Sequence, residues 1–415
     1  MEMKRVVVTG LGTINPIGNS VPEYWANLEK GVSGSEMITS FDASKFKTKF
    51  ACQVKNFDPN AYFDRKELKK IDPYTQFALV AVEEAMKDSG LNTEAIDLDM
   101  AGVVWASGIG GMQTFTEELR GYFAGDGTPR FSPYFIPRMI SDIAAGYISI
   151  KYGFRGPNFS TVSACASSTN GIISALDIIR TGKANVIIAG GSEASVNEVG
   201  VGGFNSMQAM STNNDEYKTA SRPFDVTRDG FVIGEGGGCI ILEEYEHAKA
   251  RGAKIYCELK GGGMSADAYH LTAPHPEGLG ARKVMENALK DADLTIQDID
   301  YINVHGTATP LGDIAEAKAI ISVFGDYAFK LNISSTKSMT GHLLGAAGAI
   351  EAIAAIFAIC TDTIPPTINF KSPDPEIDSR LNITPNSAQK RSVKAALSNT
   401  FGFGGHNASI IFQKI

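Results

Sequence analysis

Cysteine is scarce in this chain, and the way it is distributed excludes several kinds of protein. The 415 residues contain five cysteines, an odd number, with no close pairs and no spacing typical of a zinc site. A disulfide-stapled secreted domain or a zinc module would need paired or regularly spaced cysteines. We therefore expect free thiols in a reducing compartment.

The chain also lacks an excess of positive charge and a long uninterrupted apolar run. Its formal net charge of −8 argues against general binding to nucleic acid or to an anionic membrane. The first ten residues show neither the apolar span nor the cleavage site of a signal peptide. The most apolar expected helix, residues 346–360, carries Glu351 and is too short to span a bilayer. These absences predict a cytoplasmic protein that binds neither nucleic acid nor membrane.

What the chain does have is an alternation of short strand patterns and apolar helical patterns. A strand over residues 158–163, a helix over 171–180 and a strand over 185–190 predict a βαβ unit with parallel strands. A second series, with strands at 301–305 and 331–335 and helices at 312–324 and 346–360, has the same order. We predict two related α/β halves, residues 1–254 and 255–415, whose strand ends meet at one site.

Two local patterns outside this alternation predict irregular structure. Residues 6–9 form a strand pattern that ends in Gly10 and Gly12, which we interpret as a turn. The prolines and aromatics of residues 131–137 are typical of an ordered loop or of the wall of an interface.

Cys165 stands where the strand pattern 158–163 gives way to the apolar helical run. A thiol at a helix N-terminus lies close to unpaired N–H groups that favour its anion, so its pKa is expected to fall. Small neighbours, including Ala164 and Ser167, leave room for a substrate carbonyl at the sulfur. Taken alone, an unpaired cysteine is more often a small buried hydrophobe.

Two of the six histidines, His305 and His342, also follow predicted strands, and each is flanked by glycine. Singly, each is best explained as a hydrogen-bonded structural residue. Together with Cys165 in the same topological position, they suggest a thiol nucleophile served by two imidazoles. Zinc held by these three residues is the competing explanation, but no short local spacing and no further ligand supports it.

A glycine-rich segment near the C-terminus, residues 398–407, contains Phe401 and Phe403. Its glycines would allow a mobile lid whose phenylalanine closes a pocket. A hairpin turn before a last strand at 408–412 is the structural alternative, and both can hold at once.

Four cations, Arg65, Lys66, Lys69 and Lys70, cluster in an otherwise acidic protein. Helical spacing would place them on neighbouring stripes. A solvated charged face is the default interpretation, and a docking patch for an acidic partner is the alternative.

These motifs together resemble the β-ketoacyl-acyl-carrier-protein synthases, which are condensing enzymes of the thiolase-like superfamily. The resemblance covers essentially the whole chain. It implies an α/β thiolase-like fold with layers in the order α-β-α-β-α, and Gly108–Gly111 and the Phe135 segment are similar to the type II elongating branch. The motifs that carry it are the Cys165 turn, His305–Pro310, Ser335–His342 and Gly402–Gly405.

The resemblance implies a decarboxylating condensation and a role for each matching residue. An acyl group moves to Cys165, and the N–H groups of Cys165 and Phe403 form an oxyanion hole. Malonyl thioester then loses CO2 beside His305 and His342, and its carbanion attacks the acyl-cysteine. The remaining implied roles are site orientation by Lys337 paired with Glu351, contact with the phosphopantetheine arm by Thr307 and Thr309, binding of substrate by Ile109, Phe135, Phe204 and Phe401, and structural support by Asp313 and Glu316.

The resemblance also implies partners. Acyl- and malonyl-loaded acyl carrier protein brings the phosphopantetheine, so no cofactor or metal of the enzyme's own is expected, and the chain is expected to form a homodimer. Two positions depart from the family. His406 stands where many relatives carry threonine, and Asn213 stands where relatives often place a docking arginine, so docking would lean on the Arg65–Lys70 patch.

Other functions remain possible from these residues. A polyketide ketosynthase would share every catalytic residue, and a non-catalytic partner subunit would generally lack Cys165. A degradative thiolase would need a second cysteine near the C-terminus, and none follows Cys360. Initiating synthases carry asparagine at the position of His342.

Overall fold

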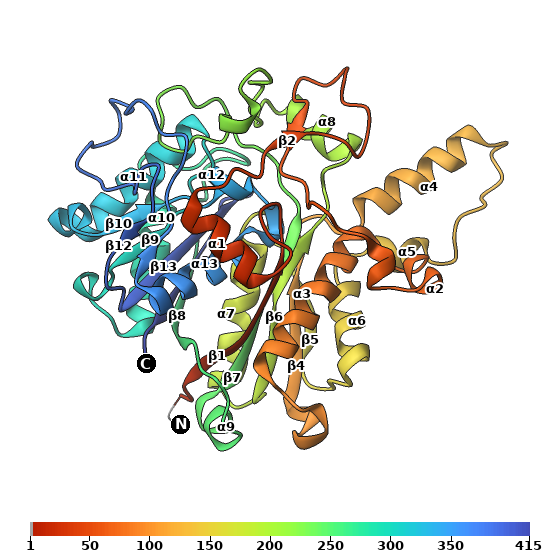
Figure 1. Cartoon of the computed structure of the whole chain (residues 1–415), viewed down its shortest axis with the longest axis horizontal. Coiled ribbons are helices and arrows are strands. Elements are labelled where there is room, and N and C mark those ends of the chain that lie inside the picture. Colours follow the sequence, from red (N-terminus) through yellow and green to blue (C-terminus); the bar gives the residue numbers. More distant parts are fainter. Residues whose placement is uncertain (1–2) are drawn as a thin grey trace.

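The computed structural model describes residues 3–415, and its main sheet has ten strands arranged as two similar groups of five (Figure 1). In each group three parallel strands are followed by two antiparallel ones. The groups are joined where β1 and β8 pair at Val7 with Glu258 and Val8 with Cys257. In spatial order the strands are β10 (Asn332–Ser334), β9 (Tyr301–Asn303), β13 (Ala395–Gly402), β14 (His406–Gln413), β8 (Cys257–Ala266), β1 (Val6–Ile14), β7 (Gly236–Glu244), β6 (Val186–Glu193), β4 (Ala101–Ala106) and β5 (Asn158–Thr161).

Helices form three layers around these two groups of strands. Between the groups lie α7 (Ser167–Arg180) and α13 (Ala347–Thr361), which pack against each other and against strands of both. The first group is covered on its outer face by α3 (Pro73–Ser89) and α6 (Ile143–Tyr152), and the second by α10 (Leu279–Ala292) and α11 (Pro310–Phe324). The predicted order of layers, α-β-α-β-α, is confirmed.

The central helix α13 shows why the sequence produces this arrangement. Its alanines and isoleucines are apolar on every side, as expected for a helix enclosed between two sheets. The helical stretch Leu344–Thr361 is longer than predicted and apolar enough to cross a membrane by length and composition, but 83% of it is buried inside the fold. It is therefore accounted for as a core helix.

Shorter elements connect and cap the layers. The pair α4 and α5 stands out from the body of the molecule, with α2 beside α5 (Figure 1). The remaining helices are α1 (Val21–Lys30), α2 (Arg65–Leu68), α4 (Met112–Ala124), α5 (Phe135–Met139), α8 (Glu198–Ser206), α9 (Tyr245–Ala250) and α12 (Lys337–Thr340), and the remaining strands are β2 (Glu36–Met37), β3 (Phe50–Ala51), β11 (Thr363–Ile364) and β12 (Gln389–Lys390). Single 3-10 turns occur at Pro59–Ala61, Thr93–Ala95, Leu98–Met100, Tyr217–Thr219, Ile296–Asp298, Gly325–Phe329 and Leu344–Ala346.

Three local predictions are wrong. Gly10 and Gly12 lie inside β1, where a Cβ on Gly12 would stand 2.0 Å from the backbone oxygen of Ala81, so they allow α3 to approach the strand. The expected loop at 131–137 contains the start of helix α5. The cationic cluster does not share helical stripes, because α2 ends at Leu68 and leaves Lys69 and Lys70 outside it. The boundary at residue 254, between α9 and β8, stays a prediction.

Candidate active site

Cys165 lies in a tight turn between β5 and α7. The turn is set by Ala164, whose φ of 51° is left-handed, and by Ser167, whose hydroxyl accepts from the N–H of Ser163 and donates to the oxygen of Ala164. Helix α7 begins at Ser167, four residues earlier than predicted, so the thiol stands directly at its N-terminal end. A Cβ on Gly402 would come within 2.7 Å of the Ser163 oxygen, so glycine lets the end of β13 approach this turn.

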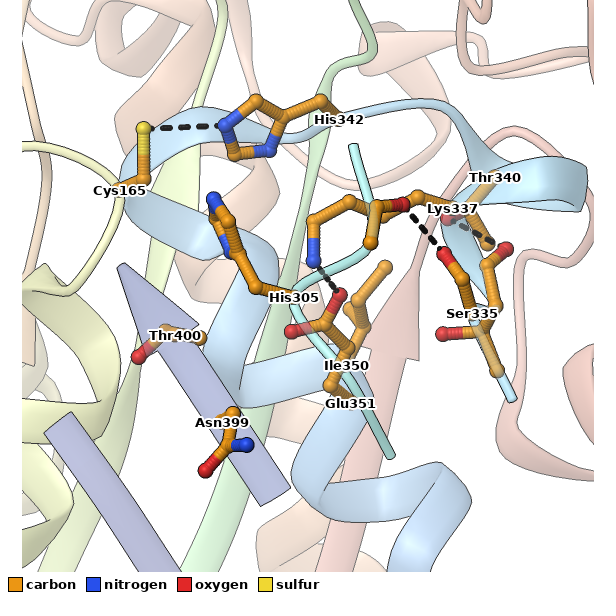
Figure 2. A network of polar contacts seen from close by, with 12 residues as sticks. Cys165, His305, Ser335, Lys337, Thr340, His342, Ile350, Glu351, Asn399 and Thr400 are labelled. Carbon is orange, nitrogen blue, oxygen red and sulfur yellow. Dashed lines mark hydrogen bonds and ion pairs between the residues drawn. The ribbon is translucent and has the colours of Figure 1, made fainter. Parts of the chain in front are cut away.

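Two imidazoles share the site with the sulfur, as Figure 2 shows. Nε2 of His342 lies 3.0 Å from Sγ of Cys165. The rings of His305 and His342 are 5.4 Å apart and nearly perpendicular, at 89°. Phe231 stacks edge-on against His342 at 5.4 Å, and Phe401 lies 5.5 Å from His305. The fold thus brings Cys165, His305 and His342 together at one site, as their positions after predicted strands indicate.

Burial decides the protonation states of these groups. It raises the pKa of Cys165 to about 12, although the Lys337 ammonium and the N–H groups of Phe403 and Cys165 lower it again. The expectation of a lowered cysteine pKa is therefore wrong, because desolvation outweighs the helix N-terminus. Burial and the Lys337 charge hold the pKa of both His305 and His342 well below 6.5. At pH 7 the site holds a neutral thiol and two neutral imidazoles.

A buried ion pair lies next to the two imidazoles of this site. Lys337, at the start of α12, pairs with Glu351 of α13, and both residues are 1% exposed (Figure 2). Burial raises the pKa of Glu351, and the Lys337 ammonium opposes that shift. The pair places one positive charge next to two imidazoles and so helps to keep both neutral.

We expect Lys337→Met to destabilise the protein, because it leaves the Glu351 carboxylate buried without its partner. The free energy of unfolding should fall by about 3 kcal/mol, measured by urea denaturation. The double variant Lys337→Met/Glu351→Leu should recover part of that loss, since the orphaned charge is gone. If the free energy of unfolding of Lys337→Met lies within about 0.5 kcal/mol of the parent value, as for an ordinary surface substitution, the ion pair contributes little to stability.

The two predicted supporting carboxylates hold backbone close to the site. Glu316 accepts from the N–H groups of His305 and Gly306, both at 2.9 Å. Asp313 lies 3.2 Å from Arg228 and accepts from the N–H of Phe224 at 2.9 Å. Since both side chains are buried and bonded to structural groups, a role in positioning fits them better than acid or base chemistry.

A cavity of about 500 Å³ opens at Cys165. It is lined mainly by apolar groups, as expected for a site that takes an aliphatic chain. Sequence reasoning missed Phe231 and Leu344, because neither stands in a motif. The predicted residues that line it are Ile109, Cys165, Phe204, His305, Thr307, Thr309, Asp313, Glu316, His342, Phe401 and Phe403.

Other predicted residues lie outside the cavity. Phe135 belongs to α5 and stacks against Phe131 and Phe115, at 5.4 and 6.2 Å. His406 is exposed at the start of β14, and the side chain of Asn213 accepts a hydrogen bond from the N–H of Glu216. Within residues 3–415, no group of three or more histidine, cysteine or carboxylate side chains is arranged to hold a metal ion.

The comparison with known families settles what kind of protein this is. Residues 3–248 match the family model of the β-ketoacyl synthase N-terminal domain, and residues 256–371 match that of the C-terminal domain. The chain belongs to the β-ketoacyl synthase family. The predictions of this family, of its thiolase-like α/β fold and of a condensing acyltransferase are confirmed.

Full-length relatives support this assignment. The β-ketoacyl synthase described here is 46% identical over 415 residues to 3-oxoacyl-[acyl-carrier-protein] synthase 2 of Coxiella burnetii, covering all of both chains. It is 47% identical over 413 residues to the synthase 2 of Staphylococcus aureus strain COL, covering 100% of this chain and 99% of that one.

Solved structures agree with the sequence relatives. A β-ketoacyl synthase from Burkholderia phymatum superposes with a TM-score of 0.92 at 34% identity, over all of both chains. A type II polyketide ketosynthase, solved as AntDE in complex with its acyl-carrier protein AntF and bound to the hexaketide, has a TM-score of 0.92 at 36% identity, also over both full chains.

Proposed function

We propose that this synthase elongates fatty-acyl chains by condensing an acyl group held on Cys165 with malonyl-carrier protein. The observation that carries the proposal is that Cys165, His342 and His305 lie together in the wall of a mainly apolar cavity. Its full-length relatives named 3-oxoacyl-[acyl-carrier-protein] synthase 2 are 46–47% identical. The type II polyketide ketosynthase is 36% identical, which favours fatty-acid elongation over the polyketide alternative.

The first step is transfer of the acyl group from the carrier thioester to Cys165. Because the thiol is neutral at pH 7, its proton passes to Nε2 of His342 as the sulfur attacks the carbonyl carbon. The carbonyl oxygen becomes an oxyanion that the N–H groups of Cys165 and Phe403 stabilise. The carrier thiolate then leaves and takes the proton from His342, which returns the imidazole to its neutral form.

The second step breaks a C–C bond in malonyl-carrier protein. The carboxylate leaves as CO2, and its electron pair moves to the thioester, whose oxygen becomes an enolate. A neutral imidazole has one ring N–H to donate, so His305 can give this oxygen a hydrogen bond. His342 can give a second one in the tautomer that carries its proton on Nε2, the nitrogen that faces the sulfur. The enolate carbon then attacks the acyl-Cys165 carbonyl, the C–S bond breaks, and Cys165 leaves as a thiolate. β-Ketoacyl-carrier protein departs, and the thiolate takes up one proton from solvent, which balances the proton consumed by the decarboxylating condensation.

The lowered histidine pKa values predict how decarboxylation depends on pH. Lowering the pKa shifts the protonation of each ring to more acidic solution, so the neutral donors persist below pH 6.5. For enzyme already acylated on Cys165, the rate of CO2 release at saturating malonyl-carrier protein should stay constant from about pH 8 to about pH 6. A half-loss at or above pH 6.5 would contradict the neutral-imidazole account.

We further propose acyl carrier protein as the partner, a homodimer as the assembly and the cytoplasm as the location. Phosphopantetheine arrives on the carrier, and the proposed chemistry uses side chains and backbone N–H groups of the synthase. For the dimer, β5 is a sheet edge with exposed Phe159 and Val162, and the projecting α4 and α5 expose Phe123 and Ile136. Such apolar exposure is typical of a surface covered by another chain, and Phe135 stands in this region, where a partner subunit's cavity would receive it.

The Arg65–Lys70 patch supports the docking role. Arg65, Lys66 and Lys69 are exposed and Lys70 is half-buried, and none of the four belongs to an ion pair within residues 3–415. Asp72, just after the patch, accepts from the N–H of Thr114 in α4, at 3.0 Å. Since α4 begins three residues after Ile109 of the cavity wall, this hydrogen bond links the segment next to the patch with a segment next to the cavity.

Reversing two charges of this patch should weaken carrier binding. For Lys69→Glu/Lys70→Glu we expect the KM for acyl-carrier protein to rise about tenfold at low salt with kcat little changed, and salt should reduce the difference. The control Lys87→Glu/Lys290→Glu reverses two exposed lysines, one at the opposite end of α3 and one in the last turn of α10. Equal KM values for both double variants would reject the docking role, and the Arg65–Lys70 patch would then be explained as a solvated charged face.

Reconstituted condensation tests the proposed function. Purified synthase receives saturated acyl-carrier proteins of increasing length together with malonyl-carrier protein. Products two carbons longer, with one CO2 released for each, are expected. Release of CO2 without a longer product, or no turnover with any saturated acyl chain, would reject fatty-acid elongation.

A further inference from the structure

A buried carboxylate that the reaction does not use lies at the end of β6. Glu193 is 0% exposed, and no lysine or arginine forms an ion pair with it in the described chain. Four donors converge on it instead. Oε1 accepts from the hydroxyl of Ser107 at 3.1 Å and the N–H of Ile109 at 3.2 Å, and Oε2 accepts from the N–H groups of Gly108 at 2.8 Å and Gly345 at 3.1 Å.

The backbone around this carboxylate is shaped to receive it. A Cβ on Gly108 would stand 2.8 Å from Oε2 of Glu193, and a Cβ on Gly345 would stand 2.1 Å from the N of Gly108. Any side chain at either position would push the two turns apart. The turn after β4 and the turn before α13 therefore meet only because both carry glycine and share one carboxylate.

Each of these turns supplies a wall of the cavity. Ile109 follows Gly108, Leu344 precedes Gly345, and both side chains line the cavity and pack in one apolar cluster with Phe204 and Phe231. Leu344 has a φ of 50°, a left-handed conformation that a leucine adopts only when its surroundings impose it. The bond from the N–H of Gly345 to Glu193 is one of the contacts that impose it.

Glu193 itself does not line the cavity, so its effect passes through the two turns. Burial raises the pKa of Glu193 to about 7, although its four hydrogen-bond donors lower that pKa again. In its ionised form the carboxylate offers acceptor sites to all four donors at once. An amide has one acceptor oxygen and an N–H2 group that would face further N–H donors, so the turns could not stay bonded to it in the same way.

We propose that Glu193 is a positioning residue that sets the acyl-chain-length limit of the synthase by fixing Ile109 and Leu344 against each other. This inference rests on the proposed function, because it concerns the acyl chain that Cys165 receives. When Glu193 holds both turns through its four hydrogen bonds, acyl chains up to a certain length fit the cavity, and longer chains meet the side chains at its end. Without these hydrogen bonds, the side chains of Ile109 and Leu344 separate more easily. The rate of acyl loading then falls less steeply as the acyl chain becomes longer.

The test compares acyl loading of Cys165 across a series of saturated acyl-carrier proteins, measured as initial rates by intact mass. For Glu193→Gln, the ratio of rates for the best chain and for the first poorly accepted longer chain should fall about tenfold, the effect of one buried hydrogen bond left unmade. Ser107→Ala removes one donor only and should move the ratio in the same direction by a smaller factor, which keeps the test decisive if the first variant folds poorly.

Glu84→Gln is the matched control. Glu84 also accepts from two backbone N–H groups, those of Thr13 and Val21, both at 2.8 Å, and it does not line the cavity. Its variant should lose thermal stability and keep the parent length profile. An unchanged profile in both Glu193→Gln and Ser107→Ala, or the same flattening in Glu84→Gln, would overturn the inference. If the parent chain loads no acyl group, the proposed function itself fails.

Discussion

Replacing Cys165 with alanine is expected to abolish condensation and to leave the fold intact. Among residues 3–415, Cys165 supplies the one thiol that lines the cavity, and the acyl-enzyme of this mechanism cannot form without it. By analogy with removal of other catalytic nucleophiles, the rate of product formation should fall by at least about 10⁴-fold. Because alanine fills almost the same buried space, the melting temperature should change little.

Cys360→Ala serves as the control for that experiment. Cys360 is an exposed thiol near the end of α13 that does not line the cavity. Its variant should retain parent activity. Condensation by Cys165→Ala within tenfold of the parent rate would contradict the assignment of the nucleophile and would favour the non-catalytic partner-subunit alternative.

Replacing His305 with alanine should slow decarboxylation far more than acyl transfer. His342 is the ring that contacts the sulfur, at 3.0 Å, whereas the ring of His305 lies 5.4 Å from the ring of His342. Losing one donor to the enolate oxygen typically costs a factor of about 10² to 10³. Acyl loading of Cys165 in the same variant should stay within about fivefold of the parent, because its proton acceptor is still present.

The split between the two half-reactions is what tests this assignment. Loading is followed by the mass of the acyl-enzyme, and decarboxylation by CO2 release from preloaded enzyme. His342→Ala should impair both steps. The control His247→Ala should impair neither, because His247 lies in α9 and its ring pairs with Glu243 of β7. Equal losses in loading and decarboxylation for His305→Ala would contradict the assignment of His305 to the decarboxylation step alone.

Motifs at strand ends made the site predictable from sequence. Cys165, His305 and Lys337 each follow a parallel strand, β5, β9 and β10, and Phe403 follows β13. Within each half the carboxyl ends of parallel strands lie along one edge. A strand pattern followed by a polar or glycine-rich turn in both halves therefore predicts that these residues gather at one site. The same alternation predicted the two halves and the enclosed helix α13.

Features that depend on packing could not be predicted. Phe231 and Leu344 reach the cavity from segments without a motif, and Gly12 resembled a turn although it serves the close approach of α3. The pKa of Cys165 was expected to fall because the helix N-terminus is visible in the sequence, whereas the desolvation that raises it exists only in the folded chain. The sequence around Glu193 does not predict its role, because its four hydrogen-bond donors come from two turns that are distant in the sequence.

The neutral state of the site has a consequence for the order of events. A thiol with a raised pKa reacts slowly with stray electrophiles, and it becomes a strong nucleophile only as His342 accepts its proton beside a bound thioester. Binding of the acyl chain in the cavity places the carbonyl where that transfer can occur. Reactivity is thereby tied to the presence of the correct substrate.

Intact-protein mass spectrometry after incubation with acyl-carrier protein, followed by addition of malonyl-carrier protein, tests the central claim most directly. The account predicts an added acyl mass that maps to Cys165 and disappears when malonyl-carrier protein is supplied, while β-ketoacyl-carrier protein accumulates in equal amount. No adduct with any acyl chain, or an adduct at another residue that discharges with the same kinetics, would contradict it.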